Sequence, residues 1–102
     1  MEIVVFYIPC PNKNIAIEIS EALINQKLAA CTNMIEGVSM FHWGDGMQRD
    51  TEVYLIAKTT LNHIASLELK VLQMHPYETP AVVHWIAQVN EAYGTWMLSQ
   101  VN

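Results

Sequence analysis

Hydrophobic residues in the first part of the chain form two different patterns. Residues 2–8, EIVVFYI, form a nearly continuous run of β-branched and aromatic side chains. Such a run predicts a strand that is buried on both faces. Apolar residues then recur every three or four positions from Ile15 to Leu23, which predicts a helix over residues 12–27 with Asn12 as its N-cap. The chain therefore opens with a strand followed by a helix.

Two extended segments follow, and GDG at residues 44–46 joins them. Residues 28–43 contain no proline and only one glycine, Gly37, while residues 47–60 alternate apolar with mixed side chains. This pattern predicts a β-hairpin. Fifteen residues at ~3.3 Å each span roughly 50 Å, whereas a compact chain of this size is only about 33 Å across. Unless Gly37 bends it, the hairpin should overhang the globule and need a partner.

The second half of the chain continues with a helix, a strand and a helix. Residues 61–75 have helical spacing, AVVHWIA at 81–87 predicts a short strand, and residues 90–102 predict a terminal helix. The order β-α-β-β-α-β plus a C-terminal helix is an α+β, ferredoxin-like sandwich, with helices on one face of a four-stranded antiparallel sheet. We expect one domain over residues 1–102. The sheet face without helices should be hidden by self-association.

Composition narrows the classes of function. The chain is 52% hydrophobic and 15% charged, which is more apolar than a small globule can bury alone and again suggests subunit contacts. A net charge of −5 with only five Lys and Arg residues argues against nucleic-acid and anionic-membrane surfaces. The start MEIVVFYIPC is typical of a buried strand, not a signal peptide, and no apolar run approaches the ~20 residues of a membrane span. We therefore expect a cytoplasmic protein.

The segment HPYETP at residues 75–80 concentrates polar side chains between two prolines. Proline restricts the residue before it, so the backbone of this turn should be rigid. Local sequence favours a structural connection in which His75 caps the preceding helix. The alternative is a functional cluster of His75, Tyr77 and Glu78, offering one nitrogen and one or two oxygen ligands to a metal, or an acid–base pair.

The remaining candidate side chains are scattered. Cys10 precedes the first predicted helix, whose N-terminus would lower the pKa of the thiol and make it a better metal ligand or nucleophile. A small apolar residue in a turn is the favoured interpretation, because no His or Asp lies beside it in the sequence. Cys31 is expected in the core and His63 in solvent, and Asp50 and Glu52 are expected to be solvated charges. The four histidines lack the spacing of a catalytic zinc site.

Several short motifs resemble the CutA family of divalent-cation tolerance proteins, in that family's order and over nearly the whole chain. They are LAAC at 28–31, Trp43-Gly44, Glu52, KTT at 58–60, HPYETP at 75–80, and Tyr93 with Trp96. The resemblance implies a ferredoxin-like subunit, similar in architecture to the PII signalling proteins, in a stable homotrimer whose long hairpins pair between neighbours. It also implies a role in tolerance of copper and other divalent ions, since some members bind copper.

The same resemblance indicates site residues. The family's shared cluster lines a cleft between subunits and falls here on Trp43, Glu52, Lys58, Thr59, His75, Pro76 and Tyr77. Ile8 stands where bacterial relatives commonly carry a cysteine linked to copper, and Cys10 follows two positions later on the same face of an extended strand. We therefore expect weak binding of copper or another divalent cation by His75, with Cys10 as the second candidate ligand, and no obligatory cofactor.

Two functions of different classes remain. The first is a non-enzymatic trimer that takes part in metal tolerance, or acts as a PII-like signalling protein that binds a cation or a small anion. The second is a small enzyme that uses Lys58, His75 and Tyr77 as acid and base groups in the same cleft. The first is preferred, because the sequence contains no recognisable set of nucleophile, base and orienting residue and no glycine-rich phosphate loop.

Overall fold

The computed structural model describes residues 1–101 and has the predicted order of elements. These are β1 (Glu2–Cys10), α1 (Lys13–Asn25), β2 (Cys31–Trp43), β3 (Gly46–Thr59), the 3-10 turn η1 (Leu61–His63), α2 (Ile64–Met74), β4 (Val83–Gln88) and α3 (Glu91–Gln100). The four strands form one sheet in the order β2-β3-β1-β4, and every neighbouring pair is antiparallel. This is the ferredoxin-like arrangement, so the predicted α+β fold class is confirmed.

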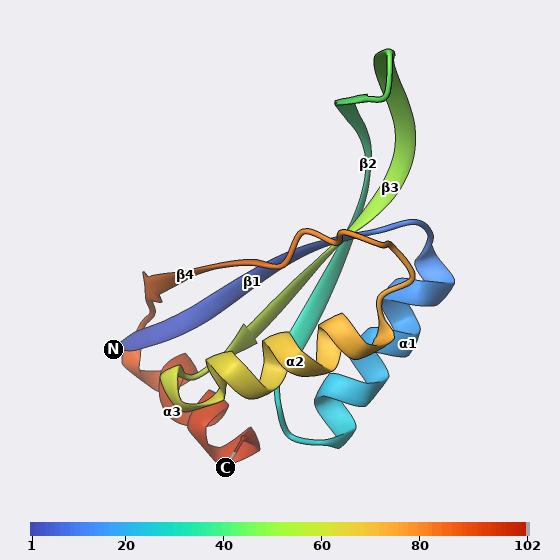
Figure 1. Cartoon of the computed structure of the whole chain (residues 1–102). Helices are drawn as coiled ribbons and strands as arrows, with labels where there is room; N and C mark the ends of the chain where they lie inside the picture. Colours follow the sequence, from blue (N-terminus) through green and yellow to red (C-terminus); the bar gives the residue numbers. More distant parts are fainter. Residues whose placement is uncertain (102) are drawn as a thin grey trace.

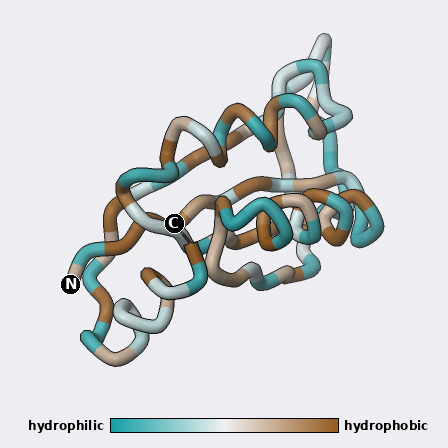
Figure 2. The backbone as a smooth tube through the Cα atoms, turned by 90° about the horizontal axis from the view of Figure 1, so that it is seen from below, coloured by the Kyte–Doolittle hydropathy of each residue, from teal (hydrophilic) through white to brown (hydrophobic). Residues whose placement is uncertain are grey.

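Helices α1 and α2 cover one face of the sheet. Alternate residues of β1, namely Val4, Phe6 and Ile8, are fully buried beneath them. Leu23 of α1 and Leu67 of α2 belong to the same cluster of buried side chains, and burial of each contributes about 1.5–3 kcal/mol. Figure 1 shows both helices below the sheet, and Figure 2 shows hydrophobic segments recurring along helices and strands. The main core therefore lies between this face and the two helices.

The short helix α3 lies near the N-terminus (Figure 1). It packs on Ile3 of β1, whose side chain points to the face opposite Val4, Phe6 and Ile8. A second cluster of buried residues joins Ile3 of β1 to Met97 and Val101. Our expectation that no helix covers this face is therefore wrong at that end of the sheet. The rest of the face stays open, with Val83 and Trp85 of β4 about half exposed.

The hairpin of β2 and β3 overhangs the body of the molecule, as predicted (Figure 1). The two strands pair without interruption from the Cys31–Lys58 pair to the Trp43–Gly46 pair. Strand β1 accompanies β3 only as far as Val53, so residues 46–52 of β3 are paired on one side alone. The molecule is consequently 47 Å long but only 23 by 21 Å across.

Gly37 does not bend the hairpin, since the β2–β3 register passes through it unbroken. A Cβ atom built on Gly37 would instead overlap Cε2 of Tyr54 on the neighbouring strand. The absence of a side chain therefore makes room for an aromatic ring. The turn itself depends on Gly44, whose φ of +63° is the positive value that a two-residue hairpin turn requires.

Local signals account for most element ends. Asn12 caps α1 as predicted, because its side-chain oxygen accepts a hydrogen bond of 2.9 Å from the backbone N–H of Ile15. Asn90 occupies the N-cap position of α3 without a side-chain bond. Three strands differ from prediction by two or three residues at one end, since β1 continues to Cys10, β2 begins only at Cys31 and β4 only at Val83. The predicted last helix ends at Gln100, and Asn102 lies outside the described residues.

Strand β1 runs past its proline for a simple reason. Pro9 pairs with Tyr54 of β3 on one side, whereas the pairing with β4 on the other side stops at Tyr7. A proline, which has no N–H, is tolerated in a strand where no partner needs that donor. The carbonyl oxygen of Pro9 lies 2.8 Å from Nε2 of His75. The turn after α2 therefore supplies the hydrogen-bond partner of β1 beyond Val83, the first residue of β4.

Candidate functional site

The turn at residues 75–80 lies where β1 ends and the hairpin leaves the body of the protein. Helix α2 stops at Met74, and His75 has extended backbone angles of −70° and 132°, as expected for a residue that precedes proline. The predicted rigid connection after α2 is therefore present. Three side chains meet at this point, from β3 (Glu52) and from the turn (His75 and Tyr77).

His75 uses both of its ring nitrogens inside the protein. Nε2 lies 2.8 Å from the carbonyl oxygen of Pro9, and Nδ1 accepts the backbone N–H of Tyr77 at 3.2 Å. A carbonyl can only accept, so Nε2 carries the proton and the ring is the neutral Nε2–H tautomer. His75 is the C-cap residue of α2, as predicted, but it caps through its backbone N–H, which donates to the carbonyl oxygen of Val71, and its imidazole turns to Pro9 and Tyr77 instead.

Tyr77 donates its hydroxyl hydrogen to Oε2 of Glu52 over 2.6 Å. Glu52 is only 9% exposed, so the prediction of a solvated charge is wrong at this position. Burial raises the pKa of Tyr77, and so do the hydrogen bond to Glu52 and the negative charge of that carboxylate. Tyr77 therefore stays protonated at neutral pH and continues to donate. Its ring lies 4.7 Å from the ring of His75.

Cys10 is buried on the helix-covered face of β1 and is not an activated thiol. Its Sγ contacts the carbonyl oxygen of Ile8 at 3.4 Å, and burial, followed by the negative charge of Glu52, raises its pKa to about 11. The expectation of a lowered pKa is wrong, because β1 continues through Cys10 and points its side chain into the core. No group of three or more His, Cys, Asp or Glu side chains within residues 1–101 is arranged to hold a metal. Metal binding by His75 and Cys10 stays a prediction.

The other residues of the predicted cleft are far from this turn within one chain. Pro76 belongs to the turn, but Lys58 and Thr59 lie at the other end of β3, six and seven residues beyond Glu52, or roughly 20 Å along the strand. Trp43 is in the last β2 pair before the hairpin turn. A cleft that includes all seven residues therefore requires a neighbouring subunit. The acid–base set of the enzyme hypothesis is not assembled in a single chain.

Lys58 and Thr59 have local partners instead. The Lys58 ammonium lies 5.2 Å from the centre of the Tyr93 ring of α3, a favourable cation–π position. Thr59 is fully buried, and its hydroxyl donates to the carbonyl oxygen of Leu28 at 2.7 Å. Both residues therefore help to hold the far end of the sheet together.

Two further side chains lie elsewhere than predicted. Cys31 is only partly buried, and its Sγ is 2.9 Å from the hydroxyl of Tyr93. This contact, together with burial, raises the pKa of Tyr93 to about 12. His63 is buried, with Nδ1 2.7 Å from the hydroxyl of Thr60, so the expectation that it faces solvent is wrong. No sequence pattern signalled the first contact, because 62 positions separate its partners.

Comparison with known proteins then identifies the family. A model of the CutA1 divalent ion tolerance proteins matches residues 4–100. The chain belongs to this family. A CutA homologue of Xenopus laevis is 38% identical over 93 residues, which cover 89% of this chain and 62% of that relative. A divalent-cation tolerance protein CutA of Thermus thermophilus is 36% identical over 95 residues, which cover 91% and 92% of the two chains.

Solved CutA structures have the same fold. The Thermus thermophilus divalent cation tolerance protein superposes with a TM-score of 0.89 at 34% identity, and each chain is covered completely. A protein of Archaeoglobus fulgidus, described as a periplasmic divalent cation tolerance protein, superposes with a TM-score of 0.92 at 30% identity over both full chains. The hairpin and the turn at residues 75–80 therefore belong to a fold that the CutA proteins share.

The chain matches only part of its longer relatives. It spans 62% of the Xenopus laevis relative and 56% of the Mus musculus relative. Within residues 1–101, every helix is too short or too polar to cross a membrane. The cytoplasmic location stays a prediction.

Proposed function

We propose that this CutA-family protein works as a non-enzymatic homotrimer that responds to divalent cations, copper in particular, and binds them weakly in clefts between subunits. The observation that carries the proposal is the position of Glu52. This buried carboxylate lies on β3 beside Val53, the last residue that β3 pairs with β1. The unpaired edge of β3 thus begins at Glu52, the residue that also provides the carboxylate of the site.

The unpaired edge supports self-association. Residues 46–52 of β3 lack a strand on the β1 side, and β2 is the outermost strand of the sheet over its whole length. Exposed strand edges present free N–H and C=O groups and are readily paired by another chain. A neighbouring copy whose strand adds beside residues 46–52 would also place new side chains next to Glu52.

The open sheet face supports the same assembly. Ile35 of β2 is 56% exposed, and Val83 and Trp85 of β4 are each 47% exposed. Contiguous apolar surface of this kind is uncommon on a monomer and is typical of an interface. Self-association would bury it, in keeping with the trimer that the family resemblance implies.

The side chains at the turn support a cation as ligand. Oε2 of Glu52 accepts from Tyr77, whereas no residue within 1–101 donates to Oε1, which is available to a cation. His75 can offer Nδ1 only by giving up its 3.2 Å bond from Tyr77, so binding through it should be weak. A carboxylate, a phenol and a neutral imidazole favour a cation over the small anion that a PII-like signalling role would require.

A copper titration tests the proposal. Cu(II) is titrated calorimetrically into the wild type and into the His75→Ala and Glu52→Gln variants. His84→Ala serves as the matched control, since His84 lies on β4 with its ring against Phe6 and is not part of the turn. Both site variants should bind more weakly than the wild type, and the control should not. Identical isotherms for all four proteins would contradict the assignment of the turn.

A further inference from the structure

The tip of the hairpin carries two methionines and a histidine on one face. His42 pairs directly with Met47 across the two strands, and Met40 precedes His42 by two positions. Side chains two apart on one strand, or opposite each other on paired strands, point to the same side of the sheet. Met40, His42 and Met47 therefore form one cluster, which we call the tip cluster, and Arg49, which pairs with Met40, lies at its edge on the same face.

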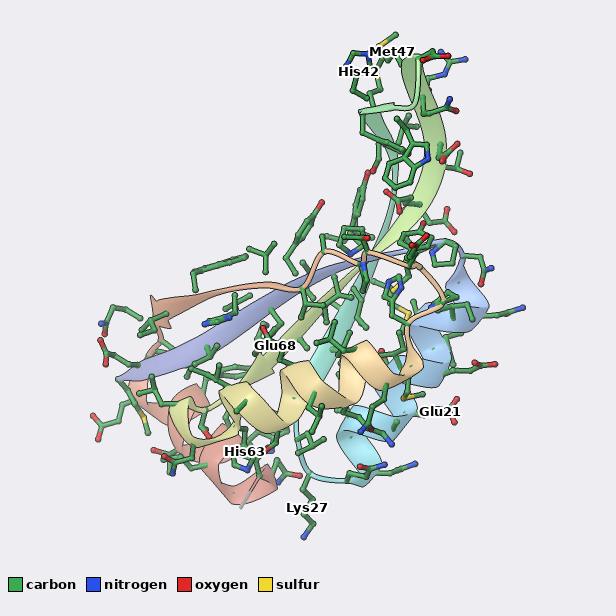
Figure 3. The ribbon with its side chains drawn as sticks, in the orientation of Figure 1. Glu21, Lys27, His42, Met47, His63 and Glu68 are labelled. Carbon is green, nitrogen blue, oxygen red and sulfur yellow. The ribbon has the colours of Figure 1, made fainter. Side chains whose placement is uncertain are left out.

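The tip cluster is exposed although most of its atoms are apolar. Met40 is 59% exposed and Met47 is 69% exposed, which are high values for methionines. The three side chains and Phe41 line an open pocket of about 350 Å³. Figure 3 shows His42 and Met47 next to each other at the end of the hairpin. Packing in the core therefore does not explain why these apolar side chains occur at the tip.

His42 has both ring nitrogens available for a ligand. Unlike His75, it receives no hydrogen bond from any residue within 1–101. The donor atoms of the tip cluster are thus two thioether sulfurs and one imidazole nitrogen. Directly opposite side chains have Cβ atoms about 4.5–5.5 Å apart and diagonal neighbours about 7–8 Å. Methionine is long and flexible, so the three donors can reach one ion between them.

This donor set selects among metals. Soft thioether ligands favour Cu(I), and imidazole also suits copper. Magnesium and calcium require oxygen ligands, and the zinc sites of proteins use Cys, His and carboxylate ligands, of which the tip cluster offers one. We propose that Met40, His42 and Met47 form a binding site for Cu(I).

The site is separate from the cleft at the turn. Glu52 pairs with Gly37, five residues before His42, so the two places are roughly 17 Å apart along the hairpin. The donors also differ in kind, because oxygen and neutral imidazole at the turn suit a divalent ion, and thioethers suit Cu(I). The inference depends only on the tip cluster and does not rest on the proposed function.

A site-resolved titration tests it. The full-length protein is labelled with ¹³C at the methyl groups of its six methionines and titrated with Cu(I) under ascorbate without oxygen, and separately with Ag(I). The methyl signals of Met40 and Met47 should shift together and saturate, while that of Met34, packed against the core, should not. The titration is repeated with Cys31→Ser, because the partly exposed thiol would otherwise compete for the metal. The tip signals should shift there as well.

Variants complete the test. Met40→Leu and Met47→Leu keep the side-chain volume and remove the sulfur, and His42→Ala removes the nitrogen. Each should weaken Cu(I) binding at the tip at least about tenfold, since even the loss of a group that only orients a ligand costs about 10–100-fold. Met34→Leu and His84→Ala are the matched controls and should bind Cu(I) as the wild type does.

Three results would overturn the proposal. The first is a Cu(I) titration in which the Met40 and Met47 methyl signals stay in place. The second is unchanged affinity in the tip variants. The third is a pair of tip signals that respond to protein concentration but not to copper, which would assign the cluster to contact with a second copy of the chain. Zn(II) should leave both signals unmoved, and equal shifts with Zn(II) would contradict the selectivity.

Discussion

Tyr77 and Glu52 illustrate how a single contact ties a turn to a distant strand. The hydroxyl of Tyr77 donates to the carboxylate of Glu52 over 2.6 Å, and bonds of this charge-assisted kind are shorter and stronger than neutral ones. Glu52 is almost completely buried, and within residues 1–101 only Tyr77 donates a hydrogen bond to its side chain. The contact fixes the 75–80 turn against the root of the hairpin.

Removal of this donor should therefore cost more than an ordinary hydrogen bond. Tyr77→Phe leaves a buried carboxylate without its partner and should lower the free energy of unfolding by about 2–3 kcal/mol. Tyr54→Phe is the matched control, because its hydroxyl bonds only to the neutral hydroxyl of Ser39 at 2.6 Å, and it should cost about 1 kcal/mol. Denaturant titrations at one fixed protein concentration measure both. Equal losses would contradict the special role of Glu52.

Cys10 makes stability depend on alkaline pH. Its pKa rises from 9.0 to about 11 in the folded protein, so the unfolded chain loses the thiol proton at lower pH than the folded chain. The contribution of this group to stability is thus complete below pH 9 and is lost as the pH rises through 11. Cys10→Ala leaves a cavity whose cost does not depend on pH. Its unfolding free energy should fall less steeply than that of the wild type between pH 9 and pH 11, and parallel curves would refute this.

At the scale of elements, local pattern predicted most of the fold. The continuous run at residues 2–8 and the helical spacing from Ile15 to Leu23 each depend on neighbours in sequence, so period alone was sufficient. The overhang of the hairpin followed from its length. Prediction failed where a residue's structure depends on a partner that is distant in sequence. Pro9 is an example, because it can remain in β1 only since the pairing of β1 with β4 stops at Tyr7.

The candidate site, too, was predictable only where it depends on residues that are neighbours in sequence. The rigidity of the 75–80 turn was predictable, because proline acts on its immediate neighbour. The burial of Glu52 was not, because its partner Tyr77 is 25 positions away and glutamate is almost never buried unless it is paired. The placement of α3 was also missed, since Ile3 and Val4 are both apolar and do not indicate which face needs a cover.

Gly37 lies in the hairpin at a position where a side chain would collide with the neighbouring strand. Gly37→Ala would force Cβ into the Tyr54 ring, which stacks on Tyr7, and should destabilise the protein by roughly 1–3 kcal/mol, as other overpacked substitutions do. Gly46→Ala, in the same hairpin, meets nothing within 4 Å and should leave stability nearly unchanged. Thermal unfolding of the two variants compares them. If both melt like the wild type, the role assigned to Gly37 is wrong.

At the scale of the whole molecule, the shape supports the assembly proposed above. A body 21 to 23 Å thick carries a hairpin that extends the molecule to 47 Å, and the face opposite α1 and α2 remains largely open (Figure 1). An isolated two-stranded hairpin is only marginally stable in water. The overhanging half of β2 and β3 should therefore gain its order from contacts with other copies.

A charge on the open face should break the assembly. Ile35 lies on that face and is 56% exposed, and Leu69 lies on α2 and is 58% exposed. Ile35→Lys should dissociate the trimer at micromolar concentration, because a buried lysine without a partner is costly. Leu69→Lys, with the same change at equal exposure, should remain trimeric. Size-exclusion chromatography with light scattering distinguishes them, and two proteins of equal mass would contradict the assignment of the interface.

The most direct test is the mass of the unmodified protein in solution. One chain has a mass of 11.6 kDa. Sedimentation velocity at micromolar concentration should give a single species with the mass of three chains, and dilution should not dissociate it readily. A stable species with the mass of one chain would contradict the account, since the overhanging hairpin and the open sheet face would then have no partner.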